Sequence, residues 1–212
     1  MSKNYLEDEY TDEASTGVSF TAFMTAVSFF FIGLLLTGSE NIQGSLRVPL
    51  YFLFISTYGF LYSTIIYANA TAFAVREDRE RMKKHMYIGD LLSEYFGVYF
   101  LVLPIPFILY SFTGDLMLAL LLLTTGHVIF FCYHYLGYSV LEGFVPSWGM
   151  KLSVATIILI NILNFFVFYQ KRYIRHYILA GINACFILFL FIISFWHSET
   201  LNLEHLDQKK RE

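Results

Sequence analysis

Six long runs of apolar residues, separated by short polar stretches, make up most of the 212-residue chain. Each run approaches the roughly 20 residues that a helix needs to cross a bilayer core of about 30 Å. None alternates like a barrel strand, and only helices and closed barrels satisfy every backbone polar group inside hydrocarbon. The pattern predicts an all-α, polytopic membrane protein with about six transmembrane helices, at Gly17–Thr37, Pro49–Ala74, Ile88–Phe112, Leu116–Gly137, Leu152–Tyr169 and Tyr177–Trp196.

The polar remainder of the chain is too short for a second folded domain. We expect residues 1–16 to form an acidic cytoplasmic tail, 17–197 a single six-helix transmembrane domain and 198–212 a second cytoplasmic tail. Only 15% of residues are charged, against about 25% in soluble proteins, which excludes a soluble catalytic or nucleic-acid-binding domain. The sequence also lacks GxSxG, HExxH and a glycine-rich phosphate loop, so it predicts neither an enzyme nor a cofactor.

The segment between the second and third runs is strongly basic. By the positive-inside rule it is cytoplasmic, and six spans then place both termini in the cytoplasm of a multi-pass cell-membrane protein. Gln170–His176 is also basic, although six-span counting places it outside. Either the early charges dominate orientation, or a span is miscounted around Ser139–Met150. The basic residues of the first segment are Arg76, Arg79, Arg81, Lys83 and Lys84.

This basic segment carries no Gly or Pro from Thr71 to Tyr87, and its charges of both signs recur at helical spacing. We therefore expect the second helix to continue as a cytoplasmic helical extension between helices 2 and 3, with a turn near Gly89. Each basic residue near an anionic membrane contributes about 1 kcal/mol of attraction. The extension is thus a candidate for binding anionic lipid, the acidic N-terminal tail or a partner.

Two further patterns concern helix packing. Pro104 and Pro106 lie within the third run and predict a kink or break, which either serves as a gate or fits a neighbouring helix. Small residues share one face in each of the first two helices and predict close packing there, with pore lining as the alternative. They are Thr21, Thr25 and Ser28 in the first helix, and Ser56, Gly59 and Ser63 in the second.

Asp90 and Glu94 are four residues apart in the third helix, with Ser93 between them. Two carboxylates on one helix face can bind a hard cation through oxygen or share a proton. The alternative is that they lie at headgroup level and pair with Arg79, Arg81 or Lys83. Because ionisable groups within membrane spans tend to be functional, both are candidates for a cation path.

The fourth helix carries His127 and His134 on one face. Either His127 is hydrogen-bonded to an asparagine of the last two helices, or it lines a transport path, or it binds a metal ion with ligands from another helix. The polar candidates in those helices are Asn161, Asn164 and Asn183. As candidates for a cation path we add His127, His134, Asn164 and Asn183 to the two carboxylates.

The segment ERMKKHMYIGDLLSEYFG resembles the junction between the second and third helices of Orai, the pore subunit of calcium release-activated calcium channels. The residues that carry this resemblance are Glu80, Arg81, Met82, His85, Ser93 and Gly97. The resemblance implies an archaeal or prokaryotic Orai-like protein that conducts or exchanges a metal cation as a homo-oligomer, a dimer or larger.

The first helix departs from that family, since it has no acidic filter residue at its outer end and no basic residues at its inner end. Orai also has four helices, whereas six are expected here. The helix count is similar to that of cation diffusion facilitators, whose paired His/Asp metal motif is absent in that form. The alternative function is a non-transporting membrane scaffold that binds a partner or anionic lipid through its basic loop.

Overall fold

The computed structural model describes the backbone of residues 3–37, 46–76 and 78–140 and, beyond these, only single helical positions between Ala155 and Ile192. The chain divides into two compact units, Met1–Pro104 and Ile105–Glu212. Apart from short turns, the described residues are helical and include no strand. The all-α prediction is therefore confirmed for this part of the chain.

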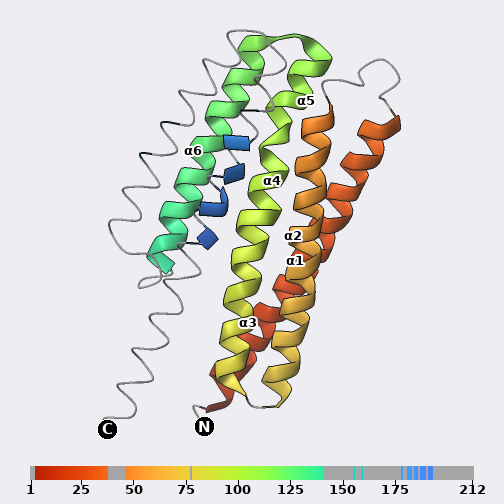
Figure 1. The fold of residues 1–212 in the computed structure, drawn as a ribbon. Coiled ribbons are helices and arrows are strands. Elements are labelled where there is room, and N and C mark those ends of the chain that lie inside the picture. Colours follow the sequence, from red (N-terminus) through yellow and green to blue (C-terminus); the bar gives the residue numbers. More distant parts are fainter. Residues whose placement is uncertain are drawn as a thin grey trace. The chain divides into compact units, whose positions relative to one another are not determined.

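The first unit contains two long helices and a third that is divided into consecutive segments. The long helices are α1 (Lys3–Thr37) and α2 (Arg47–Val75). The third consists of α3 (Arg79–Leu91), the π-helical η2 (Leu92–Val98) and α4 (Tyr99–Val102). Figure 1 shows α2 beside the third helix, with α1 crossing behind α2, and residue contacts join α2 to each of these elements.

Among the described residues, three helical segments are long and apolar enough to cross a membrane: Thr11–Thr37, Arg47–Val75 and Glu80–Thr113. They correspond to the first three predicted runs. The fourth predicted run is helical as α6 (Leu116–Val140). The fifth predicted run, in residues 152–169, lies almost entirely outside the described residues, and only scattered helical positions of the sixth, in residues 177–196, are described. The count of six spans therefore stays a prediction.

The small residues of α2 pack against the third helix, as the sequence predicts. Ser56 and Ser63 are fully buried. The Ser56 hydroxyl donates to the carbonyl of Gly97 at 2.7 Å, and the Ser63 hydroxyl donates to the carbonyl of Gly89 at 2.6 Å. Because apolar burial cannot drive helix association in lipid, close packing and hydrogen bonds of this kind must do so.

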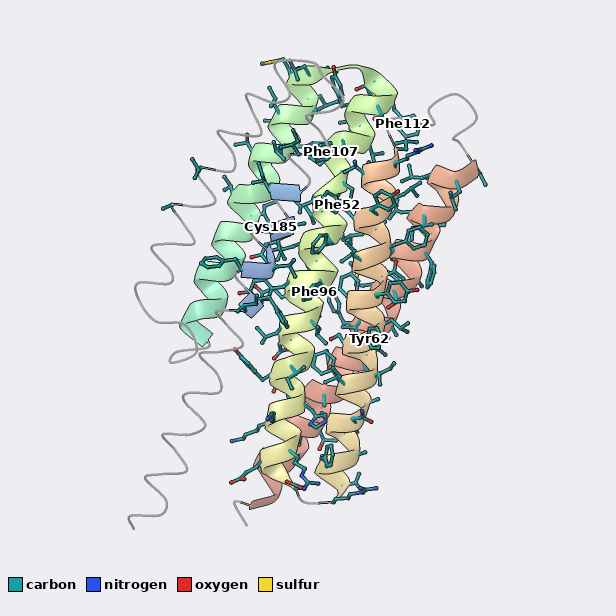
Figure 2. All side chains as sticks on the ribbon, in the orientation of Figure 1. Phe52, Tyr62, Phe96, Phe107, Phe112 and Cys185 are labelled. Carbon is teal, nitrogen blue, oxygen red and sulfur yellow. The ribbon has the colours of Figure 1, made fainter. Side chains whose placement is uncertain are left out.

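Between these two hydrogen bonds, the backbones of α2 and η2 touch. A Cβ atom on Gly59 would lie 2.5 Å from the carbonyl carbon of Phe96, and one on Gly97 would lie 2.6 Å from the ring of Phe60. Neither position has room for a side chain. Further along the same contact, the ring centroids of Phe52 and Phe100 lie 5.4 Å apart (Figure 2).

The polar face of α1 packs in the same way. Thr21 and Ser28 are buried. The Thr21 hydroxyl donates to the carbonyl of Gly17 at 2.7 Å and accepts from Thr64 of α2 at 2.8 Å. Thr25 is half-buried and donates to the carbonyl of Thr21 within its own helix. The prediction that small residues mark packing faces is confirmed on both helices.

The basic segment is helical, but it belongs to the third helix and not to the second. Helix α2 ends at Val75, and the N–H of Asp78 closes the turn on the carbonyl of Phe73 at 3.1 Å. The Asp78 carboxylate then caps α3 by accepting from the N–H of Arg81 at 3.2 Å. The prediction of a continuous second helix with a turn near Gly89 is wrong, because Asp78 supplies an N-cap that starts a new helix earlier.

Helix α4 ends at Val102, and α5 (Pro104–Thr113) begins at Pro104, where the missing proline N–H removes a helical hydrogen bond. Leu103 between them keeps helical dihedral angles, and its N–H donates to the carbonyl of Tyr99 at 3.0 Å. The predicted break is therefore present as a break in the hydrogen-bond series at Pro104, whereas a kink stays a prediction. Both prolines are buried.

In the second unit, α5 and α6 form a tight hairpin. Gly114 turns the chain with a φ of 66°, which glycine adopts without strain. Asp115 caps α6 by accepting from the N–H of Met117 at 2.9 Å. The hairpin is closed by an apolar cluster that includes Phe107 (Figure 2), with Ala119, Leu120 and Leu123.

The contact at Gly59 yields a stability prediction. We expect Gly59→Ala to lower the free energy of unfolding by about 1–3 kcal/mol, because the added Cβ meets backbone atoms that cannot rotate away. The matched control is Gly33→Ala in α1, where a Cβ meets no atom within 4 Å. Unfolding in detergent, followed by loss of helical circular dichroism, measures both. A Gly59→Ala protein as stable as the Gly33→Ala protein would contradict the close contact.

Candidate functional site

The candidate site is built around Asp90 of α3, roughly 16 Å along the helix axis from the start of that helix. The hydroxyl of Tyr67, on α2, donates to Oδ1 of Asp90. The backbone carbonyl of Asp90 accepts from the hydroxyl of Ser93 at 3.0 Å. Tyr67 is only 6% exposed, whereas Asp90 is exposed at the surface of its unit. The pair therefore joins a buried phenol to an accessible carboxylate.

Two further carboxylates lie close enough to Asp90 for their negative charges to act on it. They are Glu13, from α1, and Glu94, from η2. The sequence predicts the proximity of Asp90 and Glu94, but sequence reasoning missed both Glu13 and Tyr67. Like charges this close favour the arrival of a proton or another cation. Among the described residues, no group of three or more His, Cys, Asp or Glu is arranged to hold a metal ion.

Arg81, one of the predicted partners of Asp90, is engaged elsewhere. Its Nε lies 3.3 Å from Oδ2 of Asp78, and its guanidinium lies 5.9 Å from the centroid of the Phe73 ring. This ion pair is largely exposed and therefore contributes little to stability. The ion pair places the Arg81 side chain at the α2–α3 turn. The side chain of Arg79 lies outside the described residues.

The basic segment has one apolar and one exposed face. Met82 and Met86 are buried against Ala14 and Ala70 of the first two helices, and these contacts fix the rotation of α3. That rotation leaves Arg81, Lys83 and Lys84 exposed, and Arg76, at the end of α2, is exposed as well.

Glu94 lies in the π-helical segment η2, where the N–H of Tyr99 donates to its carbonyl five residues back. The two serines of α2 that bind the third helix are seven residues apart, whereas the carbonyls they bind are eight residues apart. A π-turn takes in an extra residue, which accommodates this difference. Sequence reasoning missed the π-helix.

The other predicted cation-path residues are not brought to this site by the described structure. His127 and His134 have helical backbones in α6, but their side chains lie outside the described residues. Asn164 and Asn183 lie outside them altogether. Their role in a cation path stays a prediction.

The residues that carry the resemblance to Orai all lie on α3 and η2. Met82 is buried, and the ring of His85 lies 4.7 Å from that of Phe73. Gly97 provides the close contact with α2. No protein-family model, curated protein or solved structure matches the chain. The resemblance to Orai therefore stays a prediction.

The cap at Asp78 can be tested separately from its ion pair. We expect Asp78→Ala to speed hydrogen exchange at the backbone N–H of Arg81, because an N-cap contributes about 1 kcal/mol. Asp78→Asn is the matched control, since asparagine caps equally well but removes the negative charge. Exchange measured by mass spectrometry should be fast only in the alanine variant. Equal exchange in the wild type and Asp78→Ala would show that the cap does not hold α3.

Proposed function

We propose that this protein is an Orai-like cation channel or transporter of the cell membrane, acting as a homo-oligomer with both termini in the cytoplasm. The observation that supports this best is the exposed carboxylate of Asp90 within Glu80–Thr113, a segment apolar enough to cross a membrane. Ionisable groups in such segments are energetically costly and are usually functional. Glu13 and Glu94 add negative charge around it.

In this proposal, the three carboxylates attract a cation at the cytoplasmic mouth of the path. Carboxylate oxygens suit hard cations and protons. Asp90 receives the cation first because it is the exposed member that is also fixed by a hydrogen bond from Tyr67. His127 stays a further candidate for the path, and the proline pair allows the third helix to bend as the path opens.

The test is cation flux into liposomes that contain the purified protein, with calcium, sodium, zinc and protons supplied in turn. We expect Asp90→Asn and Glu94→Gln each to reduce flux about tenfold or more, because each removes a charge that attracts the cation. The matched control is Asp115→Asn in the α5–α6 turn, which keeps the capping oxygen of an exposed carboxylate.

Flux that neither Asp90→Asn nor Glu94→Gln changes would leave transport in place and remove these residues from its path. Absence of flux for every cation, in protein that remains folded and inserted, would contradict the transport proposal. Circular dichroism and size-exclusion chromatography of each variant provide the folding check.

A second candidate function, a non-transporting scaffold that binds anionic lipid, is supported by the exposure of Arg76, Lys83 and Lys84 at one end of the bundle. At about 1 kcal/mol for each basic residue, changing all three to glutamine should weaken binding about a hundredfold. Binding of a fluorescent anionic phospholipid to the protein in zwitterionic nanodiscs measures this. Arg47→Gln, exposed at the opposite end of α2, is the matched control. Unchanged binding in the triple variant would exclude this surface.

A further inference from the structure

We propose that Tyr67 is the positioning residue of the cation site: its hydroxyl holds the Asp90 carboxylate in the orientation that receives the cation. This inference rests on the proposed function of Asp90 and assigns the site a second, non-acidic component. Tyr67 comes from α2, whereas the carboxylates come from α1, α3 and η2. The hydrogen bond therefore links the site to the central helix of its unit.

Two glycines leave the space that the Tyr67 ring occupies. A Cβ atom on Gly17 of α1 would lie 2.9 Å from Cδ1 and Cε1 of the ring, and one on Gly89 of α3 would lie 3.0 Å from Cε1. The same edge of the ring thus lies against both helices, where any other residue would displace it. Since both positions are helical, the glycines serve close approach and not a turn.

Helix α2 also holds the backbone beside Asp90. Ser63, one turn before Tyr67 on α2, donates to the carbonyl of Gly89, the residue that precedes Asp90. Helix α2 therefore fixes the main chain next to Asp90 through Ser63 and the side chain through Tyr67. With both held, the carboxylate has little rotational freedom left to lose when it binds a cation.

The hydrogen bond also gives the two carboxylate oxygens of Asp90 different roles. Oδ1 accepts from the buried phenol, and Oδ2 is left to face the cation. A phenol that donates to a carboxylate stabilises its charged form. Tyr67 thereby keeps the Asp90 carboxylate oriented.

The decisive variant is Tyr67→Phe, which retains the ring between the glycines and removes only the donor. We expect the apparent KM for the transported cation to rise about tenfold, in line with a hydrogen bond to a charged group, while the maximal rate changes less than twofold. Tyr62→Phe on the same helix is the matched control, because Tyr62 is 56% exposed and its ring stacks on Tyr58 (Figure 2). A Tyr67→Phe protein with unchanged KM would overturn the proposal.

A second pair of variants tests the position of the ring without altering the phenol. Gly89→Ala should raise KM as Tyr67→Phe does, because the added Cβ displaces the ring and withdraws its hydroxyl. Gly33→Ala, with open space around the new Cβ, should leave KM unchanged. A folded Gly89→Ala protein with wild-type KM would show that the ring position does not matter.

Infrared spectroscopy provides a readout that does not need transport. The carboxylate stretching band that disappears in Asp90→Asn should shift in Tyr67→Phe and stay in place in Tyr62→Phe. If the wild-type protein carries no flux but this shift occurs, the cation-transport proposal fails and the positioning of Asp90 by Tyr67 stands. If flux occurs but the band does not shift, Tyr67 has no positioning role.

Discussion

The structure of the first unit depends on the close contact between α2 and the third helix. In lipid, the burial of apolar surface provides no driving force for association, so apolar helices associate through tight packing and interhelical hydrogen bonds. Ser56 and Ser63 donate to carbonyls of the third helix. Gly59 lies between them, and because it has no side chain the two backbones can touch. The π-helix η2 and the placement of Tyr67 beside Asp90 both follow from this contact.

The candidate site is therefore a product of helix packing as much as of its charged residues. Asp90 and Glu94 alone are two acids on one helix, which is a common and uninformative arrangement. The approach of α1 and α2 adds Glu13 and the Tyr67 hydroxyl. Arg81, a predicted partner of Asp90, instead pairs with Asp78 at the α2–α3 turn.

The sequence predicts the helical class, three helices long and apolar enough to cross a membrane, and the packing faces correctly, because these depend on local composition and on helical periodicity. It places the turn near Gly89 incorrectly, since glycine can signal either a turn or a close approach, and only the neighbouring Tyr67 ring distinguishes them. The sequence does not predict Glu13 and Tyr67 as site residues for a similar reason. Their partners are distant in the chain, so no spacing within one helix reveals them.

The π-helix has a consequence for how this chain can vary in length. Because η2 takes in one residue more than an α-helix would, Gly89 and Gly97, eight residues apart, both face serines that are seven residues apart on α2. Loss of one residue between Leu92 and Val98 would restore a seven-residue spacing, which a regular α-helix also places on one face. The third helix thus contains a position where the chain can shorten by one residue without turning either half away from α2.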